Sequence, residues 1–301
     1  MIALVSAPSN LGLRPPERGA VPGASKAPEA LREAGLHERM QRDGAVDAGV
    51  VLSGRYVEDE NRAPGSPRNL QAMIAHSRRL AQRLVSVRAE QRVPIVLGGD
   101  CSILLGAGLA SRTLGGGGLI HLDGHTDFRH PGNDPACGAV AGEDLAAAIG
   151  LHAPEIADID GRGPYFDPWR TAHLGCREDD DHVREVSDTI EVTIPAAEVL
   201  RNGAAAGIAR LLGTAGLERG FWLHVDADIL DLEYMPAVDS PSTGGLSPEE
   251  LRTLLLALAP RAWGASITCF DPDLDPEGMH AQLLADLIAE GLGQLGTELD
   301  D

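Results

Sequence analysis

The chain has 301 residues, of which 43% are hydrophobic, and this is enough to bury a large core as one α/β domain. Its formal net charge is −20, from 25 Lys and Arg residues against 45 Asp and Glu residues. This excess of acid argues against nucleic acid or an anionic membrane as a partner, since either would need a basic face.

Apolar runs that predict buried strands alternate with helical patterns along the chain. The eight predicted strands are Ile2–Ser6, Asp47–Leu52, Pro94–Leu97, Gly118–Leu122, Thr171–Gly175, Thr189–Thr193, Phe221–Val225 and Ala265–Phe270. Helices are predicted over Asn69–Gln91, Ala196–Leu212 and Ser247–Leu258, the last opened by an N-cap Ser and a Pro at the first helical position. Such alternation predicts a parallel sheet covered on both faces.

We expect one domain over residues 1–301, because no repeat or linker divides the chain. Gly54–Ser66, rich in Pro, Gly and charge, predicts a long surface loop, and the acidic tail Glu298–Asp301 predicts a frayed end. Met1–Pro8 lacks the basic and long apolar regions of a signal peptide, and no segment holds 18 apolar residues. Four separated cysteines form no Cys-x-x-Cys pair, so we expect neither a disulfide framework nor a zinc knuckle, and a cytoplasmic location.

Two short runs place potential metal ligands at the ends of predicted strands. They are Leu122–Asp127 (Leu-Asp-Gly-His-Thr-Asp) and His224–Asp231 (His-Val-Asp-Ala-Asp-Ile-Leu-Asp). Residues i, i+2 and i+4 of extended backbone share one face. Five side chains should therefore converge: Asp123, His125, Asp127, Asp226 and Asp228. Acids after strands are also common as solvated loop residues or helix caps, but crowded carboxylates in two such clusters favour a divalent metal ion.

Three motifs extend this pattern over most of the chain: Gly98–Ser102 (Gly-Gly-Asp-Cys-Ser), Asp123–Asp127 and Asp226–Asp231. Their order and spacing resemble the signature motifs of the arginase/agmatinase (ureohydrolase) family. Ala27–Leu36 is similar to that family's N-terminal helix, and Leu174–Arg177 to its Ile-Gly-x-Arg strand. The resemblance implies a three-layer α/β/α sandwich around a central, mostly parallel, eight-stranded sheet.

The resemblance also implies two divalent metal ions at the strand ends, with Mn²⁺ preferred. By position, Asp123 and Asp226 would bridge the ions, Asp127 would complete one site as a candidate catalytic residue, and His125 and Asp228 would complete the other. Such a pair of ions would turn a bridging water into a hydroxide that attacks the carbon of a guanidinium or amidine. The family further implies a small-molecule substrate and a homo-oligomer, often a trimer or hexamer.

The first departure from the family pattern is Cys101, which stands where the Gly-Gly-Asp-His motif supplies a His ligand. A thiolate can bind metal but is soft, so it would shift the preference from Mn²⁺ toward Zn²⁺, Fe²⁺ or Ni²⁺, or leave that site weak. Coordination by Cys101 and a buried, inert thiol are both open interpretations.

The second departure concerns proton transfer. The family's His-Gly-Met-Pro-Leu stretch contains a His that shuttles protons, and the aligned stretch Ala141–Ala146 contains none. Glu143, Asp144 and His130 are candidates to protonate the leaving amine, although each also suits a helix start or a loop.

The third departure concerns the substrate. Cys269 aligns with the Glu that holds the guanidinium in the family, and Asp239 and Asp271 are its candidate replacements. Arg129 could pair a substrate carboxylate bidentately or only neutralise an acidic rim. The full set of candidate substrate-binding residues is Arg129, Asn133, Asp180, Asp239 and Asp271, with Asp180 matching an acid that would hold a substrate amine.

Three hypotheses follow. The first is a binuclear metallohydrolase that cleaves a non-peptide C–N bond in a linear guanidine, hydroxyguanidine or amidine other than plain L-arginine. The second is a mononuclear or differently metallated amidohydrolase that uses only His125 and Asp228. The third is an inactive, arginase-like binding protein. Metal content per chain separates the three.

Overall fold

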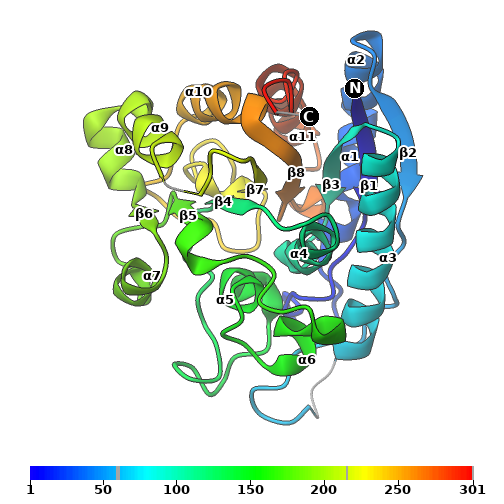
Figure 1. Cartoon of the computed structure of the whole chain (residues 1–301). Helices are drawn as coiled ribbons and strands as arrows, with labels where there is room; N and C mark the ends of the chain where they lie inside the picture. The colour runs from blue at the N-terminus through cyan, green and yellow to red at the C-terminus, as the bar shows by residue number, and fades with distance from the viewer. Residues whose placement is uncertain (59–61, 215, 300–301) are drawn as a thin grey trace.

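Eight parallel strands form the centre of the molecule in a computed structural model that describes residues 1–58, 62–214 and 216–299 (Figure 1). The strands are β1 (Ile2–Ala7), β2 (Val46–Val50), β3 (Val93–Gly98), β4 (Gly118–Leu122), β5 (Thr171–Leu174), β6 (Val192–Ile194), β7 (Phe221–Asp226) and β8 (Ala262–Thr268). Their order across the sheet is β2-β1-β3-β8-β7-β4-β5-β6, and every neighbouring pair is parallel. The predicted eight-stranded sheet is confirmed. Parts of the predicted loop Gly54–Ser66 and of the tail Glu298–Asp301 lie outside the described residues.

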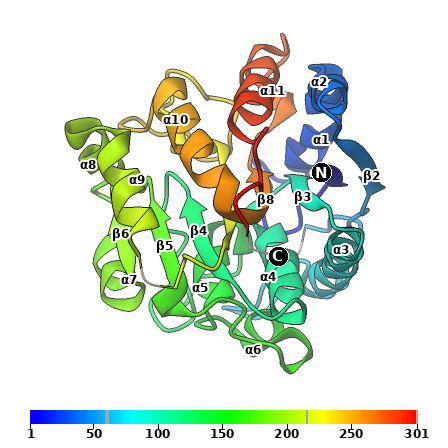
Figure 2. The ribbon, with the colours of Figure 1, turned by 45° about the horizontal axis from the view of Figure 1, so that its top comes forward.

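Helices cover both faces of this sheet, as Figures 1 and 2 show from two directions. One face shares a hydrophobic core with α1 (Ala27–Glu33), α2 (Leu36–Arg42), α8 (Ala196–Asn202), α9 (Ala204–Leu212), α10 (Pro248–Leu258) and α11 (Met279–Gly291). The other face packs against α3 (Leu70–Ala89), α4 (Leu104–Thr113), α5 (Asp144–Ala148), α6 (Pro154–Ala157) and α7 (Val183–Thr189). The three-layer α/β/α arrangement predicted for the chain is therefore confirmed.

The helix predictions hold with one correction. α3 and α10 occupy the predicted segments, and Ser247 and Glu250 form a reciprocal capping box at the start of α10, with the Ser247 amide donating to Glu250 Oε2 at 2.8 Å. The single helix predicted over Ala196–Leu212 is instead two helices, because Gly203 between them has φ 83° and ψ 152°. Only glycine adopts that conformation readily, so the helical hydrogen bonding stops there.

Seven of the eight strands have a boundary one to three residues away from the prediction, and two of these differences have a clear cause. β6 begins at Val192 instead of Thr189, because Thr189 is the last residue of α7. β8 ends at Thr268, because Cys269 has φ 61° and turns the chain out of the sheet. Within the described residues we find no helix with the length and apolar character needed to span a bilayer.

Candidate metal centre

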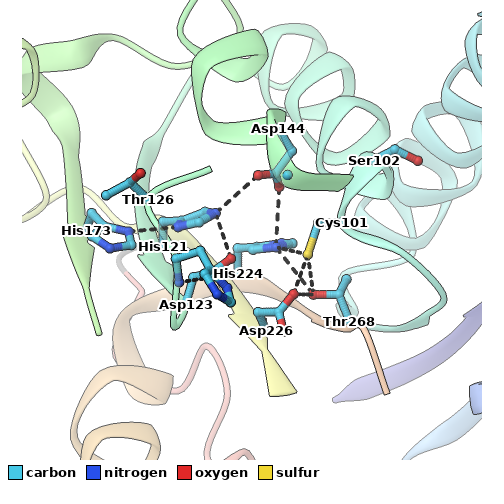
Figure 3. A network of polar contacts seen from close by, with 12 residues as sticks. Cys101, Ser102, His121, Asp123, Thr126, Asp144, His173, His224, Asp226 and Thr268 are labelled. Atoms are coloured by element: carbon cyan, nitrogen blue, oxygen red, sulfur yellow. Dashed lines mark hydrogen bonds and ion pairs between the residues drawn. The ribbon is translucent and has the colours of Figure 1, made fainter. Parts of the chain in front are cut away.

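The two acidic motifs meet at the centre of the sheet. β4 and β7 are paired neighbours with Leu122 opposite Val225, so Asp123 and Asp226, the next residues of each chain segment, lie at the same level. Both carboxylates are buried, and Figure 3 shows them beside one another. The carboxyl ends of parallel strands are where α/β proteins build their sites.

Turns, and not extended backbone, bring the remaining ligands to this point. Asp226 caps the 3-10 turn η6 (Ala227–Ile229), and its Oδ1 accepts a hydrogen bond from the Asp228 amide at 2.8 Å. Asp123 Oδ1 accepts one from the His125 amide at 2.7 Å in the same way, and Asp127 has φ 47°. The predicted alternation along an extended segment is therefore wrong, because each first carboxylate folds the chain into a turn that carries the next ligand.

Cys101 lies against these carboxylates. It opens the 3-10 turn η2 (Cys101–Ile103) after β3, and its Sγ is 2.7 Å from Asp226 Oδ2 and 2.9 Å from Thr268 Oγ1. Potential donor atoms of Cys101, Asp123 and Asp127 all lie within 4.8 Å of one another. The structure thus gathers three of the predicted carboxylate ligands around the Cys101 thiol.

The other two predicted ligands form a pair. His125 Nδ1 is 2.9 Å from Asp228 Oδ2, and the Gly124 amide donates to Asp228 Oδ1 at 3.0 Å. Burial alone would lower the pKa of His125, but the hydrogen bond to Asp228 and the surrounding carboxylates outweigh it and raise the pKa to about 10. Burial would raise the pKa of Asp228, but His125 holds it below its usual value.

The charge balance of the cluster suits a cation. Burial, reinforced by neighbouring carboxylates, raises the pKa of Asp123, Asp127 and Asp226 well above the usual range. Asp123 Oδ2 is buried and makes no hydrogen bond. An oxygen of this kind, in a group of carboxylates that resist ionisation, is the environment that a divalent ion would relieve.

A cavity of about 690 Å³ opens over this cluster, and His125, Asp127, Asp226 and Asp228 form part of its wall. Four of the five predicted substrate contacts also line it: Arg129, Asp180, Asp239 and Asp271. Asn133 is not among the residues that line this cavity. Its amide instead donates to Phe128 O and Glu185 Oε2, so it stabilises its own loop.

The acidic residues on the cavity wall differ in how many hydrogen bonds their carboxylates already accept. Asp180 accepts hydrogen bonds from the Thr126 amide, the Thr126 hydroxyl and the His182 amide. Asp271 accepts from the Gly23 and Asp273 amides. Desolvation and the charge of Asp228 raise the pKa of Asp239 to about 6. Asp239 is therefore the better candidate of the two proposed replacements for the guanidinium-binding Glu.

Two predicted catalytic residues lie away from the cavity wall. Glu143 is fully buried and accepts hydrogen bonds from the Gly138 and Ala139 amides at 2.7 and 2.9 Å, with His152 Nε2 at 2.9 Å. His130 instead faces Glu185 Oε1 at 3.0 Å. The proton-shuttle prediction for Glu143 and His130 is therefore not supported, because their polar atoms are committed to structural contacts.

Sequence reasoning missed a row of three histidines beneath the carboxylates. His173 of β5, His121 of β4 and His224 of β7 are in register across three neighbouring strands, and Ser266 of β8 continues the line. We call His173, His121 and His224 the histidine row. His121 Nδ1 is 2.9 Å from His173 Nδ1, and the rings of His121 and His224 stack with centroids 5.0 Å apart (Figure 3). A signal for these residues was present, because His121 and His224 each precede a ligand Asp by two residues in a strand.

The histidine row is fully buried, and burial sets its charge. Burial lowers the pKa of His121 to about 3 and places the pKa of His173 and His224 well below the usual histidine value. All three imidazoles are neutral near pH 7. A neutral imidazole is the form that binds a metal ion.

Comparison with known proteins agrees with these motifs. The Arginase family model matches residues 2–293. The chain belongs to the arginase family. It is 28% identical over 301 residues to the arginase of Bacillus subtilis (strain 168), covering 97% of this chain and 98% of that protein. It is 30% identical over 283 residues to the arginase of Bacillus caldovelox, covering 90% of this chain and 93% of that protein.

A solved structure supports the same assignment. The native arginase from Bacillus caldovelox superposes with a TM-score of 0.86 at 26% identity, covering 97% of this chain and 98% of that one. The family resemblance and the fold predicted from the motifs are both confirmed. This arginase-family chain is a hydrolase of the ureohydrolase type.

Proposed function

We propose that the chain is a divalent-metal-dependent hydrolase that cleaves a C–N bond of a guanidine, a hydroxyguanidine or an amidine, and not of plain L-arginine. One observation carries the proposal: Asp123, Asp127 and Asp226 converge with Cys101 beneath a cavity of about 690 Å³ that His125 and Asp228 also line. A small polar molecule fits a cavity of this size.

The residues present suit a pair of divalent ions. Asp123, His125, Asp127, Asp226, Asp228 and Cys101 would hold them, with Mn²⁺ expected first from the family. The Asp123 oxygen without a hydrogen bond and the raised pKa of three carboxylates support this assignment. A bound divalent ion lowers the pKa of water so that it can attack an electrophilic carbon at neutral pH.

Residues of the cavity wall would select and orient the substrate. Asp239, with a pKa of about 6, carries a negative charge at pH 7 and would hold a cationic guanidinium. Arg129 would bind a carboxylate at the other end of the substrate. Cys269 lines the cavity where the family has a guanidinium-binding Glu, and an uncharged thiol at that position argues for a substrate other than L-arginine.

The proposal extends to assembly and location. Family membership supports a homo-oligomer, a trimer or a hexamer, and a small-molecule substrate. A cytoplasmic location stays a prediction from the sequence. Size measurement of the purified protein in solution tests the oligomer directly.

Metal stoichiometry tests the proposal first. Protein purified without chelator is reconstituted in turn with Mn²⁺, Fe²⁺, Ni²⁺ and Zn²⁺, analysed for bound metal, and assayed with guanidine and hydroxyguanidine substrates. We expect at least two ions per chain and turnover with the preferred ion. One ion per chain would favour a mononuclear amidohydrolase, and a folded chain that takes up no metal would favour a binding protein.

Asp228→Ala sharpens this test. Loss of the carboxylate that pairs with His125 should lower metal content and reduce kcat/KM by more than about 100-fold. Asp231→Asn is the matched control in the same motif, because Asp231 caps the Glu233, Gly244 and Gly245 amides instead of lining the cavity. Equal losses in both variants would point to general misfolding of the loop and contradict a specific role for Asp228.

A further inference from the structure

Asp144 is a buried carboxyl group that the proposed mechanism does not use. It is 0% exposed, and no donor meets either of its oxygens with hydrogen-bond geometry, although the Asp127 carboxyl and the Leu145 amide lie close by. Its neighbour Glu143 is equally buried, but both Glu143 oxygens accept hydrogen bonds. Buried polar groups are almost always paired, because leaving one unpaired is costly. The Asp144 carboxyl therefore points to a ligand.

The surroundings of Asp144 identify that ligand. Asp144 Oδ2 is 3.5 Å from His224 Nε2, His224 Nε2 is 3.3 Å from Cys101 Sγ, and all three donor atoms lie within 4.8 Å of one another (Figure 3). In a tetrahedral zinc site with ordinary bond lengths, neighbouring donor atoms are roughly 3.4–3.6 Å apart. Two of the three distances between these oxygen, nitrogen and sulfur atoms are therefore close to those of a zinc site, and the third is at most 4.8 Å.

The second ring nitrogen of His224 has a hydrogen-bond partner that would orient the ring as a metal ligand. His224 Nδ1 is 2.8 Å from Ser266 Oγ, which also accepts a hydrogen bond from Trp222 Nε1 at 3.0 Å. When Nδ1–H donates to Ser266, the lone pair of Nε2 is directed at Cys101 and Asp144. Metal-bound histidines usually have a hydrogen-bond partner of this kind on the second ring nitrogen.

We propose that Cys101, Asp144 and His224 form an inner metal site for a zinc-like ion, beneath the carboxylate cluster of the family. It uses two residues, Asp144 and His224, that lie outside the ligand set implied by the family motifs, and it assigns Cys101 to this inner ion instead of to the outer pair, which the five remaining ligands would hold. His121 Nε2, 3.4 Å from Asp144 Oδ1, is the candidate fourth ligand, whereas Asp226 Oδ2, 2.7 Å from Cys101 Sγ, is too close to that sulfur to bind the same ion without moving. The inner site does not depend on the proposed hydrolysis, because its three ligands can hold an ion whether or not the outer cluster turns over a substrate.

The donor set decides which ion binds. A thiolate, an imidazole and a carboxylate together suit Zn²⁺ or Co²⁺ better than Mn²⁺, which prefers oxygen ligands. Binding releases the Cys101 thiol proton, and the Asp144 carboxyl proton if present, to solvent. The chain would then hold a soft ion at Cys101 and harder ions at the outer carboxylates.

Cobalt absorption tests the inner site directly. The metal-free protein is titrated with Co²⁺, which gives a thiolate-to-cobalt charge-transfer band and intense visible bands when four-coordinate. We expect both signals in the natural chain and no charge-transfer band in Cys101→Ser. Asp144→Asn, which is isosteric, should weaken the Co²⁺ affinity of the thiolate site at least about 10-fold, and His224→Gln should do the same.

Two controls separate the inner site from the outer cluster. Asp127→Asn should keep the thiolate band, because Asp127 is not one of the three proposed inner ligands and the asparagine side chain can replace the contact of Asp127 with Asp144. Cys176→Ser, which removes a buried thiol elsewhere, should also keep it. Circular dichroism and thermal unfolding confirm that each variant is folded, and Asp144→Asn alone suffices if His224→Gln does not fold.

Two results would overturn the proposal. A band that survives Asp144→Asn and His224→Gln but disappears in Asp127→Asn would place Cys101 in the outer cluster. Absence of a thiolate band in folded natural protein at saturating Co²⁺ would mean that Cys101 is an inert thiol. Neither result would decide whether the outer cluster is catalytic, which the substrate assay measures separately.

Discussion

Glu143 and Asp144 are consecutive, fully buried acids whose surroundings differ. Two backbone amides and His152 satisfy the Glu143 carboxylate, whereas the Asp144 carboxyl faces two imidazole nitrogens at 3.4 and 3.5 Å without a hydrogen bond. The first arrangement stabilises a folded loop, and the second leaves a group available for a ligand. Burial alone therefore does not distinguish a structural acid from a functional one, but the count of hydrogen bonds does.

Removing the Glu143 carboxylate should destabilise the fold without affecting metal binding. Glu143→Ala leaves the Gly138 and Ala139 amides and His152 without partners, so we expect a loss of about 3 kcal/mol or more in the free energy of unfolding. Glu143→Gln keeps one acceptor oxygen for the two amides and should lose less than half as much. Urea unfolding measures both. Natural stability combined with abolished turnover in Glu143→Ala would restore Glu143 as a proton shuttle.

The sequence predicted most of the outer ligand set but not how it is assembled. Asp123, Asp127, Asp226 and Cys101 are close together as expected, because the motifs follow neighbouring strands. The turn conformations at Asp123 and Asp226 depend on hydrogen bonds between side chain and backbone, which a residue pattern does not specify. The histidine row depends on which strands become neighbours, and strand order is a property of the three-dimensional fold.

At the scale of elements, Arg177 connects three segments that surround the metal centre. Its guanidinium donates to five backbone carbonyl oxygens, one each from Gly175, Asp228, Leu230, Ser242 and Thr243. The end of β5, the turn after β7 and the loop before α10 are thereby held together. Three nitrogens in one plane make these contacts, with the two hydrogens of Nη2 shared among the carbonyls of Asp228, Leu230 and Ser242, whereas a lysine ammonium offers a single nitrogen.

Arg177→Lys should weaken both the fold and the metal centre. At least two carbonyl groups would lose their partner, so we expect a loss of about 2–4 kcal/mol in the free energy of unfolding and roughly 10-fold weaker metal binding. Denaturant unfolding and metal titration measure the two effects. Arg201→Lys, at an exposed pair with Glu178, is the control and should change neither quantity measurably. Unchanged metal affinity in Arg177→Lys would show that these loops hold their ligands independently.

The break between α8 and α9 is encoded by Gly203. A methyl group at this position would meet no other atom within 4 Å, but the backbone conformation is one that L-residues rarely adopt. Gly203→Ala should therefore destabilise the chain by about 1–3 kcal/mol through backbone strain alone. Gly293→Ala, at a position without a positive φ, is the matched control in thermal unfolding. A stabilised Gly203→Ala variant would indicate that α8 and α9 can merge into the single helix that the sequence pattern predicts.

The type of each element was predictable because it follows a local residue pattern. The residues at which helices and strands begin and end were less predictable. All eight strands and the three helical segments were found where hydrophobic periodicity placed them. The largest boundary differences are at β6, whose predicted first residue Thr189 belongs to α7, and at β8, which begins at Ala262 and ends at Thr268. At β8 the left-handed backbone of Cys269 ended a strand that the hydrophobic pattern would have continued.

At the scale of the whole molecule, the buried acids and the buried histidines change the free energy of unfolding with pH in opposite directions. In the metal-free chain the pKa of Asp123, Asp127, Asp144 and Asp226 is raised, so the folded chain holds protons that the unfolded chain loses above about pH 4, and stability falls as pH rises. The raised pKa of His125, about 10, acts in the same direction. The histidine row has lowered pKa values, so the unfolded chain gains more protons below about pH 6.5 and stability falls as pH drops.

Metal-free protein should therefore be most stable in weakly acidic solution, between about pH 4 and pH 6.5. Bound metal should move the maximum to higher pH, because it stabilises the ionised carboxylates. Urea unfolding at several pH values, with and without Zn²⁺ or Mn²⁺, measures the shift. Asp144→Asn should reduce the loss of unfolding free energy with rising pH in the metal-free protein. A metal-free protein most stable near pH 8 would contradict this account of the buried charges.

The in-register contact between His121 and His173 makes one proton position depend on another across the sheet. Only one of the two Nδ1 atoms, 2.9 Å apart, can carry the hydrogen of their contact. If His173 supplies it, the neutral His121 carries its own proton on Nε2, facing Asp144 and Asp123, and those groups can be anionic. If His121 supplies it, Nε2 is bare and a carboxyl beside it must carry a proton. The tautomer of His173, on β5, therefore depends on whether the carboxyl groups of Asp123 and Asp144 are ionised. Nitrogen NMR of the His173 ring would measure that ionisation state from the neighbouring strand.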